Sequence, residues 1–505
     1  MLLTLSDYVL LGILLQCDDI DKVCLGLTCK KLWSTVKRYA VFNVDYFDFK
    51  GIELVKEHIG LKSLIPNIVR SLEHVHYVDD EIREIPEQAT HLKFSDEYNT
   101  LIKPGQIPYG IQRVDFGRSF NQPLGSEVLP ASVTTLKFGY HFNQPLVPNE
   151  SLPAGLRQLT LSSLFNQPML PGSLPAALTH LRFGLNFNQP IGPGVLPEHL
   201  VHLVFGFSME RALSEIVLPD GLKHLTLGCR FNHEIGAHAL PASIETLELL
   251  SLQLPALHAG SVPPNLTRLT ITCGENPLDP VVLPNSLTHL RINVSSSDHL
   301  VGLKSLPLKS LVLPKSFDQI LNTSLLPDTL EHLEAGAPTL ADITLPPRLV
   351  SLAIDGLTPQ TIVPHTLTSL TILNTSNNIG FIPSGVSELS LCTKFVKINF
   401  NLPPQIKHLI LNVTGISWKG EDVLEIPFGK VMHLDRLTIN DIYNPGNRTT
   451  FYIRTISGSL LVVSDKNLYG MFIPISEKLF DLNFIKMVTT NKKENQNENL
   501  KEKEK

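Results

Sequence analysis

A proline preceded by leucine, isoleucine or valine recurs along most of this chain at a nearly constant interval. The interval is 22 or 23 residues from Pro86 to Pro263, and 18 to 24 residues from there to Pro427. The anchor prolines are Pro86, Pro108, Pro130, Pro153, Pro175, Pro197, Pro219, Pro241, Pro263, Pro284, Pro307, Pro327, Pro346, Pro364, Pro383, Pro403 and Pro427. A fixed period of this length indicates a repeat architecture, in which stacked units together bury the apolar face that no unit buries alone.

Apolar residues follow nearly every anchor at the same three distances. They stand three, six and eight residues past the proline, as in Leu178, Leu181 and Phe183. The last two alternate with polar residues, which is the pattern of a short strand with one buried face. The sequence therefore predicts a β-rich repeat solenoid of about 17 units of 18 to 24 residues, one strand to a unit, in a parallel ladder. The prolines are expected outside the strands, where a missing N–H costs the ladder nothing.

A second motif, Phe-Asn-Gln-Pro, begins twelve residues past the anchor in the better-preserved repeats. It occurs at Phe120, Phe142, Phe165 and Phe187, and in the decayed form Phe-Asn-His-Glu at Phe231. We expect each phenylalanine to stack on its equivalents in neighbouring coils. We expect the asparagines, Asn121, Asn143, Asn166, Asn188 and Asn232, to turn inward and satisfy backbone groups of the bend.

The unit of roughly 22 residues with its F-N-[IQ]-P core resembles the FNIP repeat family, a subfamily of leucine-rich-repeat-like solenoids. The resemblance covers about residues 86 to 427, and glutamine stands where the family name has isoleucine. It implies a leucine-rich-repeat-like ladder of parallel strands that serves protein-protein interaction.

The residues five and seven past each anchor should point away from the core and form columns on a concave surface. Recognition by such a surface is common among solenoids. The columns are polar and weakly basic, and the residues predicted to contact a protein target are Lys137, His180, Arg182, His202, His224, Arg268 and Arg291. The three histidines would stand about 4.8 Å apart on successive strands. We expect no metal there, because no cysteine or carboxylate completes a ligand set.

The first forty residues form a separate element that reads as three short helices. Its apolar spacing resembles an F-box, which implies docking on a Skp-type adaptor of a cullin ubiquitin ligase. The residues that would dock are Leu5, Leu10, Ile13, Leu14, Ile20, Leu27 and Trp33. Ser6 stands where the family usually has proline. The alternative is a helical cap that merely covers the open end of the array.

The remaining boundaries follow from changes in composition. Residues 41–85 read as a transition and N-terminal capping segment, 86–427 as the repeat solenoid, and 428–489 as a β-rich C-terminal cap. Residues 490–505, rich in lysine, glutamate and asparagine, are predicted to be a disordered tail.

Net charge, cysteine content and apolar segment length each exclude some classes of function or location. A net charge of −6 argues against wholesale binding of nucleic acid or an anionic membrane. Six scattered cysteines favour a reducing compartment, so the expected location is the cytoplasm, with the nucleus open. No stretch is apolar enough to span a membrane, and we expect a soluble monomer.

No catalytic or cofactor-binding motif is present, so the expected function is non-catalytic protein interaction without a cofactor. Two interpretations stay open: a substrate-recognition subunit of a ubiquitin ligase, or a repeat scaffold with no ubiquitin link. An enzyme that uses the histidine column is a third class, which no motif supports.

Overall fold

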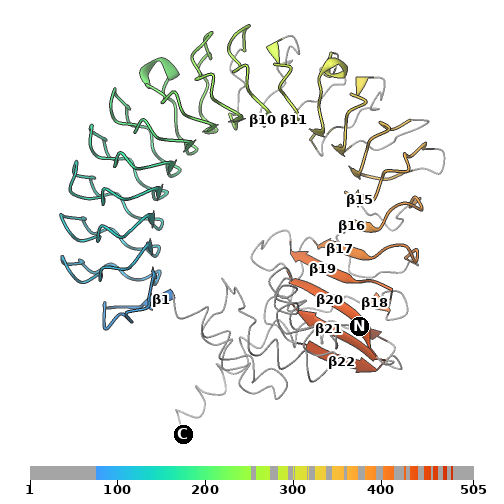
Figure 1. Ribbon diagram of the computed structural model, residues 1–505, viewed down its shortest axis with the longest axis horizontal. Coiled ribbons are helices and arrows are strands. Elements are labelled where there is room, and N and C mark those ends of the chain that lie inside the picture. The colour runs from blue at the N-terminus through green and yellow to red at the C-terminus, as the bar shows by residue number, and fades with distance from the viewer. Residues whose placement is uncertain are drawn as a thin grey trace, which may run out of the picture. The chain divides into compact units, whose positions relative to one another are not determined.

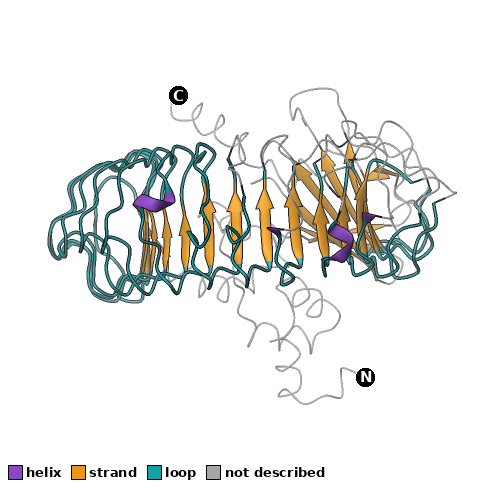
Figure 2. Ribbon diagram, turned by 90° about the horizontal axis from the view of Figure 1, so that it is seen from above, coloured by secondary structure: helices purple, strands orange, loops and turns teal. Residues whose placement is uncertain are grey.

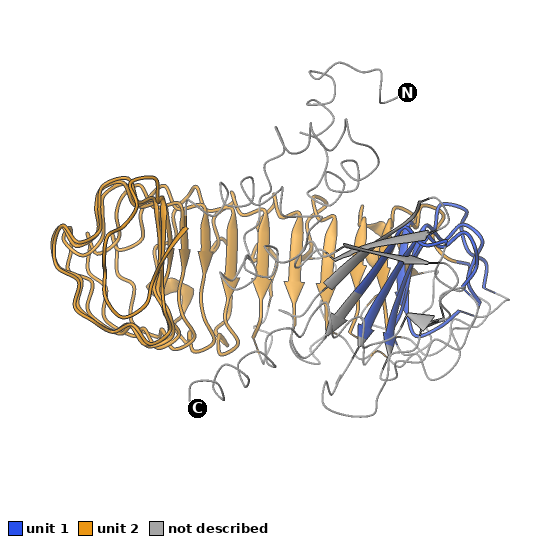
Figure 3. Cartoon of the chain, turned by 90° about the horizontal axis from the view of Figure 1, so that it is seen from below, with its two compact units in different colours: residues 1–72, 338–344, 350–505 blue, residues 73–337, 345–349 orange. Residues whose placement is uncertain are grey.

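Figure 1 shows the ribbon of the computed structural model, and Figure 3 gives its two compact units different colours. Unit 1 comprises residues 1–72, 338–344 and 350–505, and unit 2 comprises residues 73–337 and 345–349. The residues that the structure describes are 75–251, 257–272, 282–293, 300, 302–314, 317, 325–336, 344–357, 361–373, 381–393, 402–413, 426–427, 433–441, 449–456, 459–464, 470–474 and 479–480. The F-box-like module and the C-terminal tail predicted from sequence lie outside them.

In unit 2, thirteen short strands follow one another in a parallel ladder (Figure 2). They are β1 (Val75–Val78), β2 (His91–Phe94), β3 (Arg113–Asp115), β4 (Thr135–Lys137), β5 (Gln158–Thr160), β6 (His180–Arg182), β7 (His202–Val204), β8 (His224–Leu227), β9 (Thr246–Leu249), β10 (Arg268–Ile271), β11 (His289–Ile292), β12 (Ser310–Val312) and β13 (His332–Glu334). In the described part of unit 2, two short 3-10 helices, η3 (Leu213–Glu215) and η6 (Leu303–Ser305), lie between strands. The ladder begins with β1, inside the segment that the sequence assigns to a transition.

Unit 1, taken by itself, contains coils of the same kind followed by antiparallel strands. Its five parallel strands are β14 (Ser351–Ile354), β15 (Ser369–Ile372), β16 (Glu388–Thr393), β17 (His408–Val413) and β19 (Arg436–Asp441). An antiparallel extension follows: β20 (Thr449–Ile456), β21 (Ser459–Ser464) and β22 (Gly470–Pro474). The predicted solenoid, with one strand to a coil, is confirmed.

The anchor prolines form the turn that leads into each strand. The carbonyl of Pro175 accepts a hydrogen bond from the N–H of Leu178, three residues later, at 3.1 Å. Among the described residues, the same bond recurs at every anchor from Pro86 to Pro403 except Pro307. The proline ring fixes φ in the range that such a turn needs.

The prediction that all anchors avoid strands is wrong for Pro427. Pro427 lies in β18 (Ile426–Pro427), a two-residue strand that pairs only with β23 (Leu479–Phe480) among the described residues. Proline can occupy such a strand because an unpaired side of the backbone needs no N–H donor.

The core is built from stacked equivalents of the same side chains. Leu178 and Leu181 are buried to 0% and 1% exposure. The rings of Phe120, Phe142 and Phe165 stack coil upon coil, with centroids 6.1 and 6.2 Å apart. A second column stacks against them, for example Phe138 on Phe142 at 3.8 Å. Both the apolar spacing and the phenylalanine stack are therefore confirmed.

The asparagines of the Phe-Asn motif form a ladder between coils. The side-chain oxygen of Asn121 accepts the backbone N–H of Asn143 at 2.8 Å, and the oxygen of Asn143 accepts that of Asn166 at 2.9 Å. The ladder starts one coil before the first Phe-Asn motif, at Asn99, and ends at the N–H of Glu210. The amides thus satisfy the backbone of the neighbouring coil rather than their own bend.

Glycines stand two residues past the strand in several early coils, at points where neighbouring coils approach closely. A Cβ on Gly206 would overlap the carbonyl oxygen of Gly184 in the preceding coil, and one on Gly139 would overlap that of Gly117. No side chain larger than hydrogen fits there unless the backbone shifts, so these glycines fix how closely the coils stack.

Candidate interaction surface

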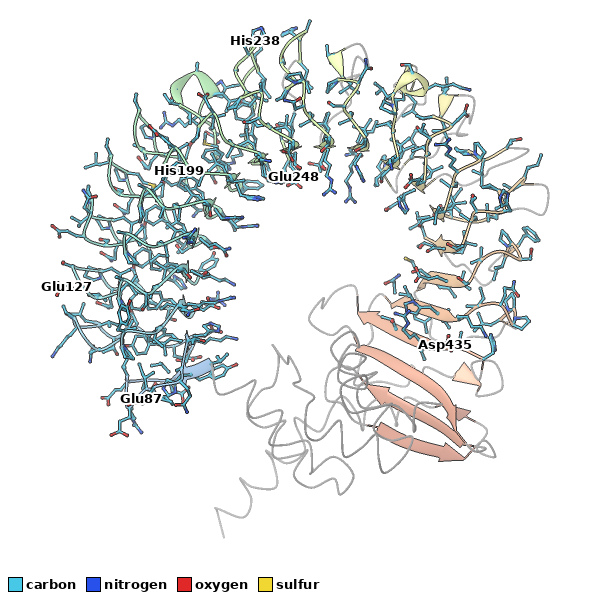
Figure 4. The ribbon with its side chains drawn as sticks, viewed as in Figure 1. Glu87, Glu127, His199, His238, Glu248 and Asp435 are labelled. Atoms are coloured by element: carbon cyan, nitrogen blue, oxygen red, sulfur yellow. The ribbon has the colours of Figure 1, made fainter. Side chains whose placement is uncertain are left out.

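The strands of unit 2 line the inner side of the arc that this unit forms (Figure 1). We define the strand face as the side chains four, five and seven residues past each anchor proline in unit 2. Glu248 belongs to it and points toward the inner side, whereas Glu127 and His238 lie on the loop side (Figure 4). The residues between those positions are buried leucines, such as Leu203 and Leu225. The strand face is therefore a polar surface on a rigid apolar support.

The predicted contact residues all lie on the strand face. Lys137, Arg182, Arg268 and Arg291 are exposed and come from β4, β6, β10 and β11. The structure brings three of the predicted residues into direct contact, namely His180, His202 and His224. The four cations lie on separate strands: Lys137 and Arg182 are two strands apart, and Arg268 and Arg291 lie on adjacent strands.

The three histidine rings stack face to face. The centroids of His180 and His202 are 4.1 Å apart, and those of His202 and His224 are 3.9 Å apart with the rings within 4° of parallel. Burial, and after it the charges of His224 and His180, lowers the pKa of His202 to about 4. Burial also lowers the pKa of the two outer histidines. The stack is therefore uncharged near neutral pH.

Face-to-face stacking does not direct the ring nitrogens to one point, because each nitrogen lone pair lies in the plane of its own ring. Among the described residues, no group of three or more histidine, cysteine, aspartate or glutamate side chains could hold a metal ion.

Carboxylates on strands β3 to β9 all have partners. Asp115 accepts two hydrogen bonds from Arg113, at 3.0 and 2.8 Å, and lies 3.3 Å from the Nε2 atom of His91. Burial raises the pKa of Asp115, but its contacts with His91 and Arg113 outweigh burial and lower the pKa to about 2. Two further carboxylates accept hydrogen bonds across the ladder: Glu245 from Lys223 at 2.7 Å, and Glu248 from Thr226 at 2.9 Å.

Arg157 is a strand-face cation that the sequence reasoning missed. It precedes β5 by one residue and is exposed. Only the columns five and seven past the anchor were considered as outward positions, whereas the residue four past the anchor is also exposed at Arg157 and Lys223. The accessible column before each strand could have been found from the same proline spacing.

Unit 1 carries a polar chain that the sequence reasoning also missed. The Nδ1 atom of His408 lies 3.0 Å from Glu388, its Nε2 atom lies 3.0 Å from the hydroxyl of Thr438, and Ser369 donates to Glu388 at 2.9 Å. A carboxylate, an imidazole and a hydroxyl in this order can activate a nucleophile. Thr438, however, is only 1% exposed, so no substrate can reach its hydroxyl. These hydrogen bonds satisfy the polar side chains that β15, β16, β17 and β19 contribute.

The residues predicted to dock an adaptor lie outside the described part of the chain; they are Leu5, Leu10, Ile13, Leu14, Ile20, Leu27 and Trp33. Within the described residues, no helix is long and apolar enough to cross a membrane.

Comparison with known proteins identifies the repeats of the early coils. The FNIP repeat family matches four consecutive segments, residues 81–119, 120–163, 165–208 and 211–251. These segments span the stacked phenylalanines and the asparagine ladder. No curated protein matches the chain.

One solved structure with which the chain aligns is CroV588, described as a novel circular LRR protein structure. The two sequences are 28% identical over the aligned part, which covers 73% of this chain, and the TM-score is 0.46. The alignment spans 63% of the length of CroV588.

Proposed function

We propose that this chain is a non-catalytic protein-interaction scaffold whose target binds the strand face of unit 2. The observation that carries this proposal is the strand face itself: its exposed side chains change from coil to coil over a ladder of near-identical buried side chains. Stacked repeats of this kind present an extended surface for recognition. The FNIP repeats in residues 81–251 support the same interpretation.

A variant that obstructs the strand face tests the proposal. Tyrosine in place of Gln158, Thr160 and Thr246 adds bulk at exposed or half-buried strand positions that accept aromatic residues. We expect this variant to lose the proteins that the intact chain enriches from a cell extract, with an unchanged melting temperature. The matched control places tyrosine at Ala154, Ala176 and Ala242, which are exposed turn residues next to anchor prolines. Equal enrichment by both variants would contradict binding on the strand face.

A second, finer proposal is that the scaffold is a substrate-recognition subunit of a cullin-type ubiquitin ligase. The F-box-like spacing of residues 1–40 supports it. The full chain should then bind a purified Skp-type adaptor, and aspartate at Leu10 and Leu14 should abolish that binding without affecting capture by the strand face. Absence of adaptor binding at tens of micromolar would leave a repeat scaffold with no ubiquitin link.

The same proposal includes a monomer in the cytoplasm or nucleus that binds neither nucleic acid nor membrane. The net charge of −6 supports the exclusion of polyanions. Size-exclusion chromatography with light scattering would test the monomer, and imaging of the tagged full chain would test the location.

A further inference from the structure

Between β3 and β9, the strand face carries one stretch of several strands in which no cation has a carboxylate partner among the described residues. On strands β4 to β7 and the residues just before them, three side chains are cationic, Lys137, Arg157 and Arg182, and none is a carboxylate. All three are exposed, and within the described residues their side chains make no ion pair. Elsewhere on β3 to β9 the cations Arg113 and Lys223 are paired with Asp115 and Glu245.

These three cations, which we call the cationic patch, have a defined layout. Lys137 and Arg182 occupy the same column two strands apart, or about 10 Å. Arg157 stands before the intervening strand, three residues back from that column. His180 lies on β6, two residues before Arg182, and His202 lies beside it on β7. Burial lowers the pKa of both imidazoles, so they are uncharged near neutral pH.

The ligand that fits this layout is short and negatively charged. In an extended peptide, side chains on one face recur about every 6.8 Å, so carboxylates two to three residues apart match a 10 Å spacing once the flexible cations adjust. Arginine and lysine bind carboxylates through charge-assisted hydrogen bonds, which are stronger than neutral ones.

The ends of the patch limit how long an anionic ligand can be. From β4 to β7 the ladder advances about 15 Å, and carboxylates follow at Asp115 on one side and at Glu245 and Glu248 on the other. A continuous phosphate backbone would have to pass over those carboxylates, whereas a peptide segment of about five residues would not. The limited length favours a peptide over a nucleic acid.

We propose that the cationic patch of Lys137, Arg157 and Arg182 binds a short acidic segment of the target protein, with carboxylates two to three residues apart. This inference rests on the proposed function and adds the chemical class of the partner. The inference places binding on the coils that carry the FNIP repeats. The uncharged histidine stack would then lie beside the acidic segment and would not supply a charged contact.

The test measures fluorescence anisotropy of a labelled peptide in which aspartate alternates with serine, titrated with the full chain. We expect binding that weakens as salt is raised from about 50 to about 300 mM. Replacing Lys137, Arg157 and Arg182 together by glutamine should weaken it about tenfold or more. The control replaces Arg83, Lys103 and Lys304, which are exposed cations outside the strands, by glutamine. It changes the net charge equally and should alter affinity less than about twofold.

Three outcomes would overturn the proposal. They are unchanged peptide binding by the triple variant, equal binding of a peptide with asparagine in place of aspartate, and tighter patch-dependent binding of a single-stranded oligonucleotide. The same variants distinguish failure of this inference from failure of the proposed function. If tyrosine at Gln158, Thr160 and Thr246 abolishes capture of partners while the triple glutamine variant binds the acidic peptide normally, only the assignment of the patch is wrong.

Discussion

The early and later coils use the same buried leucines but end their strands differently. Strands β3 to β7 have three residues each, β8 to β11 have four, and β16, β17 and β19 have six. In most coils of β3 to β7 a glycine stands two residues past the strand, as Gly206 does past β7. In the later coils Leu250 and Thr272 take the equivalent place, and each donates one more hydrogen bond to the preceding coil.

The difference shows which interactions hold each region together. Early coils have short strands, and stacked phenylalanines and the asparagine ladder hold their loops together. Strands β9 and β10 instead end on the buried aliphatic residues Leu249 and Ile271, and the residue after each adds a hydrogen bond to the preceding coil. The leucine in the middle of the strand is common to both. Substitutions at shared and at region-specific positions should therefore have different effects.

The largest effect is expected at the shared leucine. Leu181→Asp and Leu290→Asp each bury an unpaired charge at a site that is 1% exposed, which costs several kcal/mol. We expect both regions to lose their neighbouring coils, measured by hydrogen exchange and circular dichroism. The control Arg182→Asp changes an exposed residue next to Leu181 and should keep the coils folded. Normal cooperative melting of Leu181→Asp would contradict the assignment of the core.

The second-largest effect on stability is expected at the closely packed glycines of the early coils. Gly206→Ala forces the added methyl group against the carbonyl of Gly184, and we expect a loss of about 2 to 3 kcal/mol in the free energy of unfolding. Gly236→Ala meets no atom within 4 Å and should be neutral or slightly stabilising. Chemical denaturation of both variants measures the difference. Equal stabilities would mean that the coils can separate at no cost.

Loss of one asparagine should have a smaller effect. Asn143→Ala removes the acceptor for the N–H of Asn166 and for the side chain of Gln167, and we expect a loss of about 1 to 2 kcal/mol. Asn265→Ala, in a later coil, removes one exposed bond to the carbonyl of Ala242 and should cost a few tenths of a kcal/mol. Faster exchange of the Asn166 amide proton in the first variant would locate the effect in the ladder.

The smallest effect is the pH dependence of the histidine stack. The pKa of His202 is about 4 in the folded chain against 6.5 ordinarily, so the unfolded chain binds more protons between these values. Stability should fall as the pH decreases from about 6.5 to about 4, by about 1 kcal/mol, since solvent screens this partly exposed group. His202→Gln should flatten the dependence of melting temperature on pH in that range. Superimposable curves for the two proteins would argue against a coupled stack.

The solenoid could be predicted from the sequence because prolines, leucines and phenylalanines all recur at the same interval. The asparagine ladder was predicted only in part. Its start at Asn99 follows a tyrosine rather than a phenylalanine, and its partners lie in the next coil, which a single repeat does not reveal.

The predicted strand-face residues are where the columns place them, but how they pair depends on side-chain geometry. Spacing alone put three histidines at neighbouring positions; the parallel stacking of their rings appeared only in the structure. Arg157 was missed because only two of the three outward columns were considered. The contacts of His408 with Glu388 and Thr438 depend on register across three strands, which sequence does not specify.

The asparagine ladder also determines how such a chain can change length. The backbone N–H of Asn143 donates to the side-chain oxygen of Asn121, just as the N–H of Asn121 donates to that of Asn99. Removal of the 22 residues 121–142 would place Asn143 opposite Asn99, with every hydrogen bond of the ladder restored in kind. Removal of a segment that does not correspond to whole coils would leave an amide without its acceptor. Tandem duplication or loss of whole coils is thus the inherited change that this architecture tolerates best, and the interval between prolines is its unit.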